Sequence, residues 1–80
     1  MTTKYIRTSK NEIIVFTDLL VHSDFKRFEP ISAGFIIFGT NEDNDLVCTC
    51  YGESVSLELK SMADDSALAT KQIIKHNNMY

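Results

Sequence analysis

Glycine, cysteine and proline are scarce in this chain of 80 residues, which holds three, two and one of them and no tryptophan. Gly34, Gly39 and Gly52 stand apart, so there is no glycine-rich phosphate loop and no dinucleotide fingerprint, and nucleotide hydrolysis is not expected. No apolar run approaches a membrane-spanning length, and the N-terminus has no apolar signal region. These absences predict a cytoplasmic protein with no membrane partner.

The overall composition is that of an ordinary globular domain. Hydrophobic residues make up 44% of the chain and charged residues 24%. A chain of 80 residues is close to the lower limit at which one core suffices without metals or disulfides. We expect a single domain over residues 1–80, with no cofactor.

The segment from Ala33 to Lys60 carries the strongest strand signals. Phe35–Phe38 is a β-branched and aromatic run that ends in turn-forming residues at 39–44. Leu46–Tyr51 reads as a second strand, and Gly52 breaks it where a tight connection needs positive φ. The unbroken apolar character of Phe35–Phe38 predicts a central strand covered on both faces.

A third strand is predicted over Ser54–Lys60, where polar and apolar residues alternate throughout. The alternation places Val55, Leu57 and Leu59 on one buried face and Glu58 on the exposed face. With the two strands before it, this segment completes a three-stranded antiparallel meander.

A separate hairpin is predicted at the N-terminus. The strands Tyr5–Arg7 and Glu12–Phe16 flank a polar cluster of turn formers at 8–11. The edge strand of this hairpin is expected to carry Lys4 and Arg7, which would discourage edge-to-edge association.

Helical signals occur in two places. Residues 18–29 are expected to form a loop with one helical turn, which Pro30 terminates. Residues 61–64 have the Ser-x-x-acid form of a capping box and predict the start of a helix. Its packing face is predicted to contain Ala63, Ala67, Thr70 and Ile74. The expected fold is therefore α+β: a small antiparallel sheet, made of the N-terminal hairpin and the meander, packed by one C-terminal helix.

Residue types used in catalysis and metal binding occur in unsuitable arrangements. Residues 22–24 place histidine, serine and aspartate side by side, and consecutive residues cannot face one another across a catalytic site. Cys48 and Cys50 lie two apart on one strand, near the limit for a bridge, and are expected to be reduced. With His22 and His76 they offer four soft ligands, but the spacing differs from that of common zinc sites. We expect no catalytic residue and no metal.

Charge is distributed unevenly along the chain. Between Asn41 and Ser66 seven acidic residues stand against Lys60 alone, an excess of six negative charges. Acids at both turns of the meander and at the helix start could converge on one end of the domain, which would attract a basic protein surface and repel nucleic acid. The candidate partner-binding residues are Glu42, Asp43, Asp45, Glu53, Asp64 and Asp65.

The charges are also compatible with a purely structural role and with phosphate contact. Turns and helix N-termini are places where acidic residues occur for structural reasons alone. The basic residues could instead contact phosphates, but they are scattered over two segments of an acidic protein, which is weak support for direct nucleic-acid binding. They are Lys4, Arg7, Lys10, Lys26 and Arg27.

The segment Tyr51–Leu57 looks like one seen in small phage proteins. The whole chain, which is short, acidic and without an active-site motif, resembles the accessory proteins of bacteriophages and other mobile elements, including the anti-CRISPR inhibitors. The resemblance implies a non-enzymatic inhibitor in the host cytoplasm, with its acidic end on a nucleic-acid-binding surface of a host defence complex. The alternatives are a structural or regulatory subunit that self-associates and a small metal or thiol protein that uses Cys48 and Cys50. Both a monomer and a homodimer are compatible with the sequence.

Overall fold

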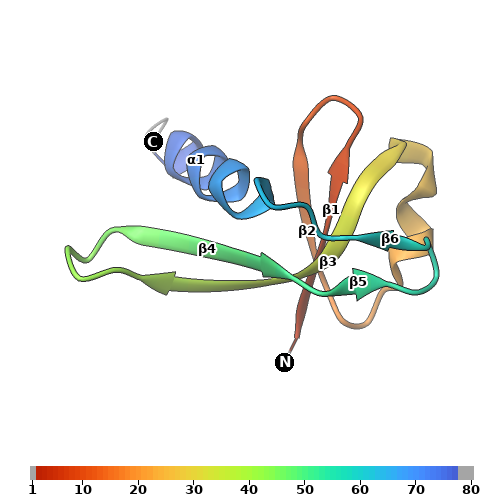
Figure 1. The fold of residues 1–80 in the computed structure, drawn as a ribbon, viewed down its shortest axis with the longest axis horizontal. Coiled ribbons are helices and arrows are strands. Elements are labelled where there is room, and N and C mark those ends of the chain that lie inside the picture. The colour runs from red at the N-terminus through yellow and green to blue at the C-terminus, as the bar shows by residue number, and fades with distance from the viewer. Residues whose placement is uncertain (1, 78–80) are drawn as a thin grey trace.

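The computed structural model describes residues 2–77, and the side chains of the last helix as far as Ile74. Its elements are β1 (Thr3–Thr8), β2 (Ile13–Thr17), the 3₁₀ helix η1 (His22–Phe28), β3 (Pro30–Thr40), β4 (Leu46–Tyr51), β5 (Glu53–Ser54), β6 (Leu59–Lys60) and α1 (Asp65–Asn77) (Figure 1). Four strands form an antiparallel sheet in the order β2-β1-β3-β4, and β5 pairs with β6. Because α1 packs against the larger sheet, the predicted α+β class is confirmed.

The sheet buries side chains on both faces, because successive residues of a strand point to opposite sides. The cluster on the face under α1 consists of Tyr5, Ile36, Cys48 and Ala69. The cluster on the other face consists of Ile6, Phe16 and Ala33. η1 covers this second cluster and stacks Phe25 on Phe16, with ring centroids 4.1 Å apart. The helical turn expected before Pro30 is therefore part of the core.

The N-terminal hairpin forms as expected, but its place in the sheet differs from the prediction. β1 pairs with β2 on one side and with β3 on the other, so β1 is an inner strand and β2 is the edge. Arg7 is only 8% exposed. The expectation that Lys4 and Arg7 protect an edge is wrong, because β3 covers the side of β1 that the hairpin leaves open.

β3 is eleven residues long and changes partners along its length. It pairs with β1 as far as Ile36, which lies opposite Thr3 at the start of β1. From Ile37 onward it pairs with β4 alone. The hairpin of these two strands therefore projects beyond the rest of the sheet (Figure 1), and we call residues 37–49 the β3–β4 arm.

The run Phe35–Phe38 lies in an inner strand, as predicted. The prediction that this run is covered on both faces of the sheet is wrong. Ile37 is 55% exposed and Phe38 is 44% exposed. Both residues lie where the arm leaves the body of the domain, so one strand neighbour and part of the covering layers are missing there.

The segment Ser54–Lys60 is not the continuous strand that its alternation predicted. β5 and β6 are two residues each and are joined by a tight turn, in which Val55 is 84% exposed and Glu58 has a φ of 56°. The hydroxyl of buried Ser54 accepts the N–H of Leu57 at 3.3 Å, which favours a turn over a strand. Leu57 is half-buried against the core and Glu58 is exposed, as predicted, whereas the placement of Val55 is wrong.

α1 begins at Asp65, slightly later than the capping-box pattern at 61–64 predicted. The carboxylate of Asp65 accepts the N–H of Met62 at 2.8 Å, which is the acid-to-backbone half of a capping box displaced by one residue. The helix buries Ala69 and packs Ile73 beside it. Three residues predicted to pack on the sheet are instead exposed: Ala63, Ala67 and Ile74. Asp65, the first residue of α1, is buried, and this fixes the rotation of the helix about its axis. The face with Ala69 and Ile73 therefore packs on the sheet in place of the predicted one.

α1 also closes the edge of the sheet at β4. The N–H of Cys50 donates to the hydroxyl of Ser66 at 2.8 Å, and the N–H of Cys48 donates to the hydroxyl of Thr70 at 2.9 Å. Two strand residues advance about 6.6 Å and four helical residues about 6 Å, so the two repeats match. The outward N–H groups of Cys48 and Cys50 are thus satisfied by helix side chains in place of a fifth strand.

Gly34 and Gly39 offer a matched test of how β3 packs against its neighbours. A Cβ added at Gly34 would overlap the carbonyl oxygen of Tyr51, whereas nothing lies within 4 Å of a Cβ at Gly39. Gly34→Ala should lower the free energy of unfolding by about 1–3 kcal/mol through overpacking. Gly39→Ala should change it by no more than about 0.5 kcal/mol. Equal effects of the two substitutions in urea titrations would contradict the close approach at Gly34.

Candidate functional site

The six acids predicted to bind a partner lie in three separate places (Figure 1). The tip of the β3–β4 arm carries three, the first residue of β5 is another, and the start of α1 carries two: Glu42, Asp43, Asp45, Glu53, Asp64 and Asp65. The arm tip and β5 adjoin opposite ends of β4, so the expected convergence of the acids on one end of the domain is wrong. Only the three acids at the tip form a group directed away from the body.

Asparagine residues shape the turn at the tip of the arm, so the carboxylates there are not needed to hold the turn. The side-chain oxygen of Asn41 accepts the N–H groups of Asp43 at 2.9 Å and Asp45 at 3.0 Å. Asn44 takes a φ of 65°, which lets the turn close. Glu42, Asp43 and Asp45 are exposed, and among the side chains that the structure describes, which end at Ile74, no cation pairs with any of them. Three negative charges without a described counter-ion therefore stand together at the tip.

Apolar side chains are exposed where the arm joins the body. Ile37, Phe38 and Tyr51 are each between 43% and 55% exposed. With Thr2 and Thr3 they line much of a shallow hollow of about 360 Å³. Exposed apolar side chains that lie together are typical of a surface that contacts another protein.

Asp65 is fully buried, so the expectation that it lies at an acidic surface is wrong. Its Oδ1 accepts a hydrogen bond from Nη1 of Arg7 at 3.0 Å, and its Oδ2 accepts from the hydroxyl of Tyr5. Asp64 beside it is exposed, with Oδ1 2.8 Å from Nη1 of Arg7, and the hydrogen bond from Arg7 lowers the pKa of Asp64. Both acids are bound to Arg7, so they hold α1 to β1.

The cluster around Asp65 is satisfied by groups of the protein itself. Nε and Nη2 of Arg7 donate to the side-chain oxygen of Asn11 at 3.2 and 3.0 Å. Burial and the bond to Asp65 raise the pKa of Tyr5 well above its usual value, so the phenol remains a neutral donor. Sequence reasoning missed this cluster. Its signal is the alternation that puts Tyr5 and Arg7 on one face of β1, where a buried cation requires a counter-ion.

His22 and Asp24 point to different partners and do not form a catalytic pair. Nε2 of His22 lies 2.8 Å from the carbonyl oxygen of Gly34, and the ring packs edge-to-face against Phe16 and Phe35. The carboxylate of Asp24 instead caps the start of η1. His22 is therefore a hydrogen-bonded core residue.

Cys48 and Cys50 are free, as expected. Burial raises the pKa of both thiols, that of Cys50 to about 11, which keeps them protonated and slow to react. In the described part of the chain no three histidine, cysteine or acidic side chains are grouped as metal ligands would be. The side chain of His76 lies outside the described residues.

Searches against protein-family models, curated proteins and solved structures found no match for this chain. No helix within residues 2–77 is long and apolar enough to cross a membrane. The candidate site therefore rests on its geometry, which consists of exposed carboxylates at the tip of the arm and exposed apolar side chains at its base.

Replacing each of the two neighbouring acids of α1 separates their roles. Asp65→Asn removes the buried charged partner of Arg7 and leaves only the exposed Asp64, so it should lower the free energy of unfolding by about 3–5 kcal/mol. Asp64→Asn removes the same charge from an exposed side chain and should leave the urea midpoint close to that of the wild type. A small effect at Asp65 would contradict the buried ion pair.

The free energy of unfolding should fall as the pH rises from about 9 towards 11. The folded-state pKa of Cys50 is about 11, above the ordinary value of 9.0, and the pKa of Tyr5 is also raised. In this window the unfolded chain releases these protons first, so the folded state loses relative stability. Cys50→Ser should make the decline shallower in denaturant titrations across the range. Identical slopes for wild type and variant would show that another group titrates.

Proposed function

We propose that this protein is a non-enzymatic binding module that docks the tip of its β3–β4 arm on a basic protein surface. The observation that carries the proposal is the group Glu42, Asp43 and Asp45, exposed together and unpaired with any described cation. Such a group attracts a basic surface over roughly 8 Å at physiological salt. At the base of the same arm, Ile37 and Phe38 expose apolar area that a partner extending along the arm would bury.

Surfaces that bind nucleic acids are the basic surfaces best suited to this tip. Such surfaces concentrate arginine and lysine side chains, which neutralise phosphates. Clustered carboxylates are attracted by the same positive potential. A module seated there blocks nucleic acid by occupancy, with no turnover and no cofactor. The resemblance to anti-CRISPR inhibitors of phages and mobile elements fits this action and stays a prediction.

The basic residues give less support to direct nucleic-acid binding. Arg7 is engaged with two carboxylates, and Nζ of Lys4 donates to the carbonyl oxygen of Leu20 at 2.9 Å. The guanidinium of Arg27 lies 4.6 Å from the ring centre of Phe28. These cations are tied to groups of the fold, and the net charge of the chain is −3.

The two alternative functions differ in their support. Raised pKa values leave little thiolate on Cys48 and Cys50 near neutral pH, which disfavours a thiol protein. Self-association is the second candidate, because Ile37, Phe38 and Tyr51 expose apolar area where the arm joins the body. A mass that rises with concentration would favour it.

Neutralising part of the tip tests the proposal. The double variant Glu42→Gln, Asp43→Asn should slow association with a basic partner by about fivefold at low salt and flatten the salt dependence, while the fold is kept. The control Glu53→Gln, Glu58→Gln removes the same charge away from the tip and should have a smaller effect. Rates are measured, across a salt series, against a nucleic-acid-binding protein captured from host lysate. Equal losses in the two variants, or no salt-sensitive partner, would overturn the proposal.

A further inference from the structure

In the body of the domain, the main sheet has one edge covered by α1 and one open edge. At β4, the hydroxyls of Ser66 and Thr70 accept the outward N–H groups of Cys50 and Cys48. At β2, the opposite edge, the N–H of Ile13 donates to Oε1 of Gln72 at 2.9 Å. Beyond that bond, β2 has no strand beside it on this side within residues 2–77.

The backbone of β2 presents unused donors on its open side. In an antiparallel pair, alternate residues direct their N–H and C=O groups to the same side. Because the N–H of Ile13 points away from β1, those of Val15 and Thr17 point away from it too. No described residue accepts either N–H. A strand laid along β2 would find both donors free.

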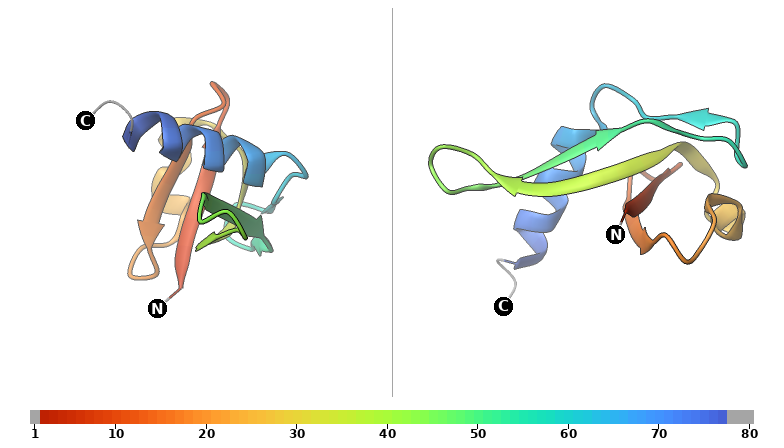
Figure 2. Two further views of the ribbon diagram at one scale, coloured as in Figure 1. Left: turned by 90° about the vertical axis from the view of Figure 1, so that its left-hand side faces the viewer. Right: turned by 90° about the horizontal axis from the view of Figure 1, so that it is seen from below.

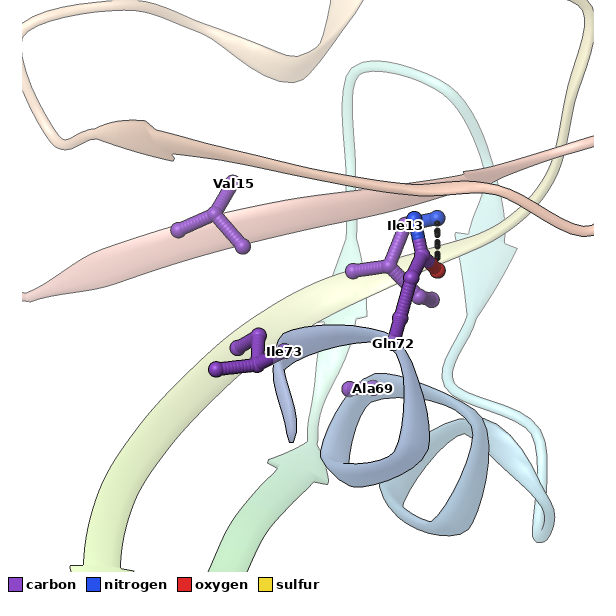
Figure 3. A pocket seen from close by; sticks show the side chains of 5 residues that line it. All are labelled: Ile13, Val15, Ala69, Gln72 and Ile73. Carbon is purple, nitrogen blue, oxygen red and sulfur yellow. Dashed lines mark hydrogen bonds between the residues drawn. The ribbon is translucent and has the colours of Figure 1, made fainter. Parts of the chain in front are cut away.

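A hollow adjoins this open edge on the face under α1. It has a volume of about 270 Å³ and is lined by Ile13, Val15, Ala69, Gln72 and Ile73. Figure 3 shows the two β2 side chains facing those of α1 across it, and the C-terminal end of α1 reaches past β2 (Figure 2, left). Alternate side chains of an added strand point to this face and would enter the hollow.

β2 lacks the features by which natural proteins protect an open edge. Ile13–Thr17 contains no charged residue and no proline, and its register with β1 has no bulge. The residues next to the strand at its two ends are Glu12 and Asp18, both exposed. The edge is therefore uncharged along its length and negative at both ends.

The acids at the ends of β2 distinguish between two occupants. A second copy paired antiparallel about Val15 would place Glu12 of each chain opposite Asp18 of the other, which is unfavourable. An extended segment with a basic residue at each end meets opposite charges instead.

We propose that the open edge of β2 binds an extended segment of a partner protein by strand addition. Backbone hydrogen bonds to Val15 and Thr17 hold the segment, an apolar side chain fills the hollow, and a lysine or arginine at each end faces Glu12 and Asp18. This surface uses β2 and α1 and none of the acids of the arm tip, so it stands independently of the proposed function.

A seven-residue peptide, Lys-Val-Thr-Val-Thr-Val-Lys with blocked termini, provides the test by NMR titration of the full chain. Binding should shift the amide signals of Val15 and Thr17 and slow their hydrogen exchange, which is fast in the free protein. Val15→Pro removes one outward N–H that β1 does not use, and should weaken binding about tenfold. The same peptide with glutamate at both ends should also bind about tenfold more weakly.

A second pair of variants keeps the test decisive if the proline variant does not fold. Val15→Lys places a charge at the hollow and should abolish binding, whereas Val55→Lys makes the same change at an exposed turn and should not. Three results overturn the proposal: no binding of the lysine-ended peptide, equal binding by wild type and Val15→Lys, or protection of the Val15 amide in the free dilute protein. A concentration-dependent mass that Val15→Lys abolishes would identify a second copy as the occupant and overturn it as well. The double variant of Glu42 and Asp43 should bind the peptide like the wild type, which separates this surface from the arm.

Discussion

The ion pair between Arg7 and Asp65 sets the relation between the sheet and the helix. It joins an inner strand to the first residue of α1, and its burial makes the loss of either partner costly. Once Asp65 is held there, Ser66 and Thr70 fall opposite β4 and Ala69 falls in the core, because helical positions follow at fixed intervals. The closure of one sheet edge and the make-up of one core cluster both depend on this contact.

Much of the architecture follows from local sequence patterns. The N-terminal hairpin, the helical turn before Pro30 and the strand β4 lie where apolar periodicity and turn residues predicted them. β3 contains the predicted run Phe35–Phe38 but is longer at both ends, from Pro30 to Thr40. Alternation failed at Ser54–Lys60, where the hydroxyl of Ser54 and the left-handed backbone of Glu58 make a turn. Side-chain bonds to the backbone compete with a strand there, and a pattern of apolar and polar residues does not register that competition.

The candidate site was predictable only as far as it is local. The acids of the arm tip belong to a turn that composition located, so their exposure follows from nearby residues. The bond from Arg7 to Asp65 joins residues 58 apart in sequence, and the pairing of β1 with β3 turned the expected edge inward. These long-range contacts decide which charges are bound inside the fold and which remain free at its surface.

β3 runs without a break from Pro30 in the body of the domain to Thr40 at the base of the tip. Its backbone is held first by β1 and then by β4, and Asn41 closes the turn beyond it. The backbone of the arm is therefore ordered before any partner arrives. For a partner bound at the tip, the entropy cost would come from side chains and hardly from the backbone, which would leave more of the interaction energy as affinity.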